Sequence, residues 1–285
     1  MLGKLFKYEN KAVSKLLTPM ALAVIILPVL GALILKIQFV FGDKFENGSI
    51  ISSIFSLASG IMIFFIVIAT ISACFISLFI LMQRYYKNLF SDEGYLTFTL
   101  PVKTSSIILS KLFTAALWSV IIAICTIIGV ITFAFFGTSA SFVNHEVVDG
   151  FCEAFKQIFE FYFIGGSVQI VFLIELLINI IVSLFTNILL MYLAITIGCQ
   201  IAKKHKVLAS IGMYFVISSV VSVLSTIIQV ITTATLYEGF DYISVDPALS
   251  DVTLILIPSI IFAIILGVCY FLLNNYILKN KLNIE

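Results

Sequence analysis

Long apolar stretches alternate along the chain with short polar connections. Each stretch is long enough for a helix to cross a bilayer, which takes about 20 apolar residues. The pattern predicts six membrane-spanning helices, at residues 19–41, 51–82, 105–136, 161–201, 208–235 and 252–278. We therefore expect an all-α polytopic membrane protein in which residues 1–285 form a single transmembrane domain.

The fourth stretch is the longest, since a helix of about 40 residues extends roughly 60 Å. We expect one long helix here, because "IELLINIIVSLFTNILLMYL" contains no Gly or Pro that would mark a turn. An amphipathic outer helix near Val148–Phe159 is expected at its start.

The N-terminal segment "MLGKLFKYENKAVSKLL" has the pattern of an amphipathic helix lying on the membrane surface. Lys4, Lys7, Lys11 and Lys15 share one stripe, and six apolar residues lie opposite: Leu2, Leu5, Phe6, Val13, Leu16 and Leu17. Residues 1–17 are therefore expected to form an interfacial helix. Glu9 lies within the apolar face, and two interpretations stay open. Either its side chain snorkels to water or pairs with a nearby lysine, or it forms a fixed salt bridge to the loop of Arg84 and Lys87.

Polar residues inside the spans follow helical spacing. In the fifth span they step by 4, 3 and 4 and fall within about a 60° arc: Ser218, Ser222, Ser225 and Gln229. The second span has a similar stripe: Ser52, Ser56, Ser59, Thr70 and Ser77. A polar face on the fourth span contains Glu175, Asn179, Ser183 and Thr186. Such faces turn away from lipid, either to let helices pack closely or to line a passage for a polar or amphipathic solute.

Glu175 is the clearest ionisable side chain inside a span. A charge at mid-bilayer costs several kcal/mol, so this carboxyl is expected to be paired, protonated or hydrated. Two interpretations stay open, a structural hydrogen bond to a neighbouring helix and a contact with substrate or a cation.

The polar stretch "RYYKNLFSDEGYLTFTLP" separates the second and third spans. Ser91, with Asp92 and Glu93 after it, can cap a short helix, while Gly94 leaves a turn open as the alternative. Pro101 ends regular structure. Residues 84–103 are thus expected to hold a short aromatic element below the membrane, with Tyr95, Leu96 and Phe98 as a docking surface for headgroups or a cytoplasmic partner.

Composition and charge agree with a membrane protein. Apolar residues make up 61% and charged residues 11%, against about 25% charged in soluble proteins. Thirteen of the 16 Lys and Arg residues fall on one side of the predicted spans and three on the other. This asymmetry predicts that both termini are cytoplasmic.

Few features indicate catalysis. There is no phosphate-binding G-x-x-x-x-G-K-[ST] loop, and "HEVVD" lacks the second histidine of a zinc protease. The five scattered cysteines form no C-x-x-C pair. We therefore expect no enzyme activity, bound metal, cofactor or nucleic-acid partner on this chain.

Three segments resemble ABC-2-type transporter permeases of low-GC Gram-positive bacteria. "YKNLFSDEGYLTFTLPVKTSSIILSKL" resembles the segment after their second span, "LFKYENKAVSKLLTP" their N-terminus and "YLAITIGCQIAKKHK" the end of their fourth span. The likeness extends along the whole chain and is most specific at Glu93–Leu96 and Thr99–Pro101. Asn10 departs from the pattern, where an apolar residue is expected.

This resemblance implies a six-helix subunit of the plasma membrane that pairs with an identical or related permease. A separate ATP-binding-cassette subunit, which holds ATP and magnesium, would bind a coupling helix formed by Ser91–Leu96 and Phe98–Pro101, and the N-terminal helix would brace it. The second and fifth spans would line the cargo route, which favours the passage interpretation of their polar stripes.

The expected function is therefore ATP-driven export of an amphipathic or hydrophobic cargo such as a peptide, an antimicrobial compound or a lipid. Short outer loops and the absence of the E-A-A loop of importers favour export. The alternatives are a secondary carrier or channel that uses Glu175, and a membrane sensor or scaffold that transports nothing.

Overall fold

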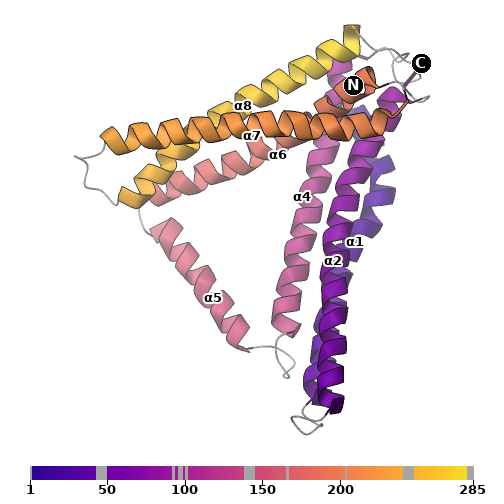
Figure 1. The fold of residues 1–285 in the computed structure, drawn as a ribbon. Helices are drawn as coiled ribbons and strands as arrows, with labels where there is room; N and C mark the ends of the chain where they lie inside the picture. The colour runs from indigo at the N-terminus through magenta and orange to yellow at the C-terminus, as the bar shows by residue number, and fades with distance from the viewer. Residues whose placement is uncertain are drawn as a thin grey trace. The chain divides into compact units, whose positions relative to one another are not determined.

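The computed structural model describes residues 2–42, 50–91, 94–95, 99, 102–137, 145–164, 167–202, 204–239 and 247–280. All regular structure in these ranges is helical: α1 (Leu2–Gly42), α2 (Ile50–Phe90), α4 (Thr104–Gly137), α5 (His145–Phe159), the short π-helix η1 (Glu160–Ile164), α6 (Ser167–Ile201), α7 (Lys206–Gly239) and α8 (Pro247–Asn280) (Figure 1). Six of the described helices are long and apolar enough to cross a membrane. The chain is an all-α polytopic membrane protein, as the apolar pattern predicts.

Five of the predicted spans lie inside one helix each. Of the fourth span, residues 161–164 lie in η1 and residues 167–201 form α6. The two residues between them lie outside the described part, so a single long helix there stays a prediction. The amphipathic segment near Val148–Phe159 forms α5, which is separate from α6. Helix α2 continues to Phe90. Arg84–Phe90 therefore extend the second span and do not belong to the connection after it.

The expected separate helix at residues 1–17 is not present, because α1 is continuous from Leu2 to Gly42 with Pro19 and Pro28 inside it. Proline removes one backbone hydrogen bond from a helix. The free-energy cost of this lost bond is offset by packing on both sides of Pro19. The exposed fractions of Val13, Leu17 and Val24 are 2%, 0% and 0%. These residues follow one helical stripe, so the same face of α1 packs before and after the proline.

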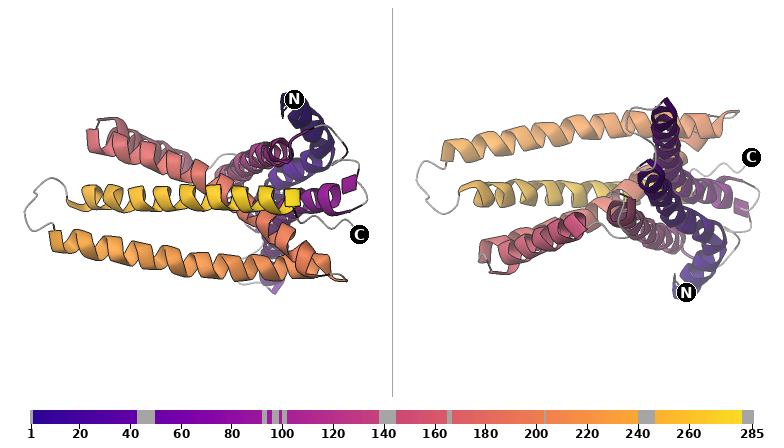
Figure 2. Two further views of the ribbon diagram at one scale, coloured as in Figure 1. Left: turned by 90° about the horizontal axis from the view of Figure 1, so that it is seen from above. Right: turned by 90° about the horizontal axis from the view of Figure 1, so that it is seen from below.

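Two compact units divide the chain. The first unit comprises Met1–Lys7, Met82–Ala116 and Ile158–Glu285, and the second comprises Tyr8–Leu81 and Leu117–Gln157. In the first unit, α6 packs against both α7 and α8. Figure 2 shows the three helices next to one another, and in Figure 1 α7 crosses in front of the other two.

Small residues set the packing within the second unit. A Cβ atom added to Gly129 of α4 would lie 2.9 Å from the carbonyl oxygen of Val24 in α1. One added to Gly137 would lie 3.2 Å from Cα of Ala32. Close approach of helix backbones at small residues is typical of membrane helices, so α1 and α4 are in direct backbone contact at two levels.

Candidate functional site

The segment between α2 and α4 was predicted to be the coupling element, and the structure describes four of its ten predicted residues. Ser91, Gly94, Tyr95 and Thr99 are described, and Tyr95 is 66% exposed. The remaining six lie outside the described residues: Asp92, Glu93, Leu96, Phe98, Leu100 and Pro101.

Gly94 lies close to the end of α2 and is helical. Its backbone N–H donates to the carbonyl oxygen of Ser91 at 2.7 Å. A Cβ atom at position 94 would lie 2.6 Å from the backbone oxygen of Leu89. Glycine is therefore required here by close approach to the last turn of α2. Gly94, Tyr95 and Thr99 are helical, in agreement with the short helix that the Ser91 cap predicts. Residues 96–98 lie outside the described part, so one continuous coupling helix stays a prediction.

A buried polar cluster in the first unit joins the end of α2 to α6 and α8. We call Tyr85, Tyr192, Thr196 and Asn274 the tyrosine–asparagine cluster. The ring of Tyr85 stacks on that of Tyr192, with centroids 3.9 Å apart and planes 6° from parallel. Tyr85, Thr196 and Asn274 are at most 1% exposed. The first residue comes from α2, the next two from α6 and the last from α8.

Hydrogen bonds connect all the helices of this cluster. The Thr196 hydroxyl lies 3.3 Å from the hydroxyl of Tyr85, 2.9 Å from Oδ1 of Asn274 and 2.8 Å from the carbonyl oxygen of Tyr192. It has a single hydrogen, so it donates to one oxygen at a time while its lone pairs accept from Tyr85. The Asn274 amide donates to the carbonyl oxygen of Leu189 at 3.4 Å.

The start of α4 is tied to the same helices. The hydroxyl of Thr104 donates to Oδ1 of Asn275 in α8 at 2.8 Å, and the Tyr192 hydroxyl donates to the carbonyl oxygen of Lys111 at 3.2 Å. Helix α2 ends just before the 91–103 connection, and α4 begins just after it. Both helices are anchored on α6 and α8. A displacement of the connection would therefore be transmitted to these two helices, since buried polar contacts are costly to break.

Sequence reasoning missed the tyrosine–asparagine cluster. Two adjacent amides in the last span, in "FLLNNYILKN", were a usable signal, because polar side chains at membrane depth usually have a partner there. The partners themselves are far away in the sequence, as the 111 residues between Tyr85 and Thr196 show.

The predicted stripe on α2 is buried at two of its positions. Ser59 and Ser77 are buried, at 5% and 0% exposure. The Ser59 hydroxyl lies 2.6 Å from Oε1 of Gln38 in α1, where it can donate. Thr70 is half-buried and Ser56 exposed, and the side chain of Ser52 lies outside the described part. At Ser59 and Ser77 the hydroxyls serve packing in this conformation.

The stripe on α7 has a different environment. Ser222 and Gln229 are exposed, and Ser218 and Ser225 are half-buried. The hydroxyls of Ser218 and Ser225 lie 3.1 and 2.8 Å from backbone oxygens of their own helix. This stripe is therefore still available to a partner or solute, and its role in a passage stays a prediction.

The polar face of α6 turns toward α8, as such faces were expected to turn away from lipid. Asn179 donates to Oγ of Ser259 at 3.1 Å, and Thr186 donates to the carbonyl oxygen of Ala263 at 3.1 Å. Glu175, one turn before Asn179, has a different environment. Its Oε2 is buried and has no hydrogen-bond partner among the described residues, so the expected bond to a neighbouring helix is not seen at this atom.

The amphipathic pattern of residues 1–17 is present as part of α1. Lys4, Lys7, Lys11 and Lys15 are exposed, and Glu9 is half-buried. Val13 and Leu17 of the opposite face are buried by the chain itself. Protein therefore covers at least this part of the face that was expected to lie on lipid. Arg84 and Lys87, which were expected in a loop, lie in α2. The proposed salt bridge of Glu9 to them stays a prediction.

Within the described ranges, no group of His, Cys, Asp and Glu side chains could hold a metal ion. All five cysteines are free thiols. No family model, curated protein or solved structure matches the chain. Its function therefore has to be inferred from its own sequence and geometry.

Proposed function

We propose that this chain is the permease subunit of an ATP-driven exporter of the ABC-2 type in a bacterial plasma membrane, with both termini cytoplasmic. A separate ATP-binding-cassette subunit supplies ATP hydrolysis, with its magnesium, and a second permease completes the complex. The cargo is an amphipathic or hydrophobic compound.

One structural observation carries this proposal. The tyrosine–asparagine cluster and the Thr104–Asn275 bond anchor both ends of the 91–103 connection to α6 and α8. A coupling element needs such an anchorage, because a loosely attached loop would absorb the movement of an ATPase instead of passing it on. The exposed Tyr95 in this connection supplies an aromatic contact of the kind enriched in protein interfaces.

The mechanism follows from these contacts. ATP binding draws the two ATPase subunits together and displaces the 91–103 connection. The stacked rings of Tyr85 and Tyr192 transmit this displacement to α6, and Asn274 transmits it to α8. Helix α7 packs against both, so the exposed polar stripe at Ser222 and Gln229 moves with them and changes its access to the two sides of the membrane.

The test is purification from the native membrane in mild detergent, with every co-purifying protein identified and quantified. We expect one ATP-binding-cassette subunit per permease. Tyr95→Ala should reduce its recovery at least tenfold, as for an interface hot spot worth about 2 kcal/mol or more. Tyr276→Ala, a matched change at a 55% exposed tyrosine of α8, should leave the recovery unchanged.

A permease that is purified alone under several mild conditions would overturn the proposal. An ion-coupled carrier would then be favoured, because Oε2 of Glu175 is buried without a hydrogen-bond partner among the described residues. Its transport should follow an ion gradient without any ATPase.

A further inference from the structure

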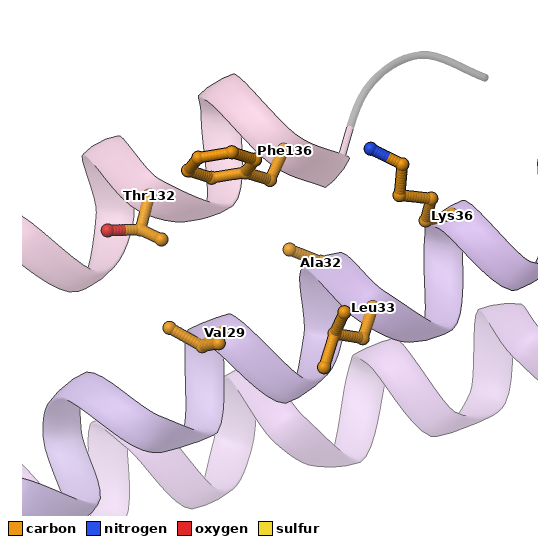
Figure 3. A pocket seen from close by; sticks show the side chains of 6 residues that line it. All are labelled: Val29, Ala32, Leu33, Lys36, Thr132 and Phe136. Carbon is orange, nitrogen blue, oxygen red and sulfur yellow. The ribbon is translucent and has the colours of Figure 1, made fainter. Parts of the chain in front are cut away.

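A small apolar pocket lies between α1 and α4 near their C-terminal ends, inside the second unit. Its volume is about 230 Å³, and it is lined by Val29, Ala32, Leu33, Lys36, Thr132 and Phe136 (Figure 3). The hydroxyl of Thr132 donates to the carbonyl oxygen of Ile128 in its own helix at 2.7 Å. Apart from the ammonium group of Lys36, the side chains around the pocket therefore offer mainly hydrocarbon.

The position of Lys36 along α1 places the pocket at a definite depth. Lys36 follows Lys15 by 21 residues, and no charged residue lies between them. At about 1.5 Å per residue the two lysines are roughly 31 Å apart, close to the thickness of the hydrocarbon core of about 30 Å. Lys15 and Lys36 therefore reach opposite interfaces, and Lys36 lies at the level of lipid headgroups.

The pocket extends from this interface into the hydrocarbon region. Val29 lies seven residues before Lys36, which is about 10 Å deeper along the helix. Leu33 is 52% exposed and Phe136 is 36% exposed, so the pocket is open along the side of the two helices. The apolar walls of the pocket thus suit an acyl chain of the bilayer. The end of the pocket at the headgroup level has the positive charge of Lys36.

We propose that this pocket binds one anionic phospholipid of the leaflet opposite the N-terminus. An acyl chain lies along Val29, Ala32 and Leu33, and the phosphate pairs with the ammonium group of Lys36. That group has three N–H donors, so it can retain a contact within the chain and still bind a phosphate. In Figure 3 its Nζ lies near the last turn of α4, at the upper end of the pocket. The proposal is independent of the exporter function.

Charge complementarity selects this occupant. The net negative headgroup of phosphatidylglycerol is attracted by a lysine at the interface, whereas the choline of phosphatidylcholine brings its own cation close to it. A lysine near an anionic membrane surface contributes about 1 kcal/mol, and this corresponds to a preference of about fivefold.

The experiment uses the purified protein in nanodiscs that contain a phospholipid with a photoactivatable acyl chain, with either a glycerol or a choline headgroup. Crosslinked peptides are mapped by mass spectrometry. We expect residues 29–36 and 132–136 to be labelled about fivefold more by the phosphatidylglycerol probe. Lys36→Gln should abolish that preference, and Lys36→Arg should retain it.

Two further variants separate the charge from the shape of the pocket. Val29→Phe fills part of the pocket without changing Lys36, and it should lower labelling by both probes. Lys15→Gln makes the same charge change at the opposite interface and should leave labelling of the pocket unchanged. Thermal unfolding of each variant shows whether it is folded, and Lys36→Gln remains the deciding variant if Val29→Phe is unstable. Equal labelling by both headgroups, or an unchanged preference in Lys36→Gln, would overturn the proposal.

Discussion

Asn10 on α1 has a polar side chain that is explained by a hydrogen bond in the fold. It stands where an apolar residue was expected, and its Oδ1 accepts a hydrogen bond from the indole N–H of Trp118 at 2.8 Å. Trp118 is 7% exposed, and a buried indole N–H without an acceptor is costly. The polar residue on α1 is therefore explained by the tryptophan on α4.

We predict that Asn10→Leu destabilises the protein by about 1–3 kcal/mol, because it leaves the indole N–H without an acceptor. Trp118 is the only tryptophan, so the emission maximum of the protein should shift in this variant. Thermal unfolding and fluorescence in detergent measure both effects.

Asn187→Leu is the matched control, because this exposed amide donates to the backbone of its own helix. It should leave the emission unchanged. If the tryptophan emission maximum is not shifted in Asn10→Leu, the Asn10–Trp118 hydrogen bond is absent from the protein in detergent.

At the scale of the elements, the contact between α1 and α4 depends on the absence of side chains. Gly129 and Gly137 lie eight residues apart on α4, which brings them close to one face of the helix. Each leaves room for the backbone of α1. Two glycines at this spacing could also make the helix flexible. The short distances from a Cβ atom at either position to atoms of α1 show that these glycines serve close packing.

Gly129→Ala should destabilise the second unit by about 1–3 kcal/mol, because the new methyl group meets a backbone oxygen that cannot move independently of α1. Gly60→Ala is the control. Nothing lies within 4 Å of a Cβ atom at that position of α2, and alanine favours the helix by up to about 1 kcal/mol.

The unfolding temperatures of both variants and the wild type are compared in one detergent. Gly129→Ala should unfold below the wild type, and well below Gly60→Ala. Equal unfolding temperatures would contradict the close approach of α1 and α4 at Gly129.

At the scale of the whole chain, long-range polar contacts link segments that the membrane pattern treats as separate spans. The tyrosine–asparagine cluster brings together α2, α6 and α8, and the Thr104–Asn275 bond adds α4. Four of the six apolar helices therefore meet within the first unit, around the two ends of the 91–103 connection. This arrangement holds the helices on both sides of the connection in one hydrogen-bond network.

We predict that Asn274→Leu raises amide hydrogen exchange in a peptide covering residues 91–103. The change removes an acceptor for Thr196 and the donor to Leu189, with a cost of about 1–3 kcal/mol, so the anchorage of the connection is weakened. Tyr85→Phe should have a smaller effect, since it keeps the ring stack and loses only the hydroxyl.

Ser222→Ala, at an exposed position of α7, should leave this exchange unchanged. Unaltered exchange in Asn274→Leu would show that the connection is held by other contacts, and the proposed route of coupling through α8 would fail.

The candidate site could be predicted from the sequence in part. The polar stretch after the second span, the exposed lysines of α1 and the helical state of Gly94 and Tyr95 after the Ser91 cap all follow from local patterns. The stripes were harder, because spacing alone does not distinguish a packed hydroxyl from an exposed one. Ser59 and Ser77 are buried whereas Ser222 is exposed, although all three follow the same helical period.

The sequence by itself determined six long apolar helices, because the length and apolarity of a span are local properties matched to the bilayer. It did not determine that residues 1–17 and the first span would form one helix. Helix α1 is continuous through Pro19, and Val13, Leu17 and Val24 pack on one stripe on both sides of it.

Only the tertiary structure decided the partners of the polar side chains. Asn10 and Trp118 are 108 residues apart, and Thr196 and Asn274 are 78 residues apart. A side chain's periodicity specifies the direction in which it leaves its own helix, but its partner depends on which helix packs there and at which height. Which helices pack together, and at which height, is decided by the fold as a whole. In this protein it brings amides and hydroxyls from distant segments into hydrogen bonds that hold the helices on both sides of the 91–103 connection.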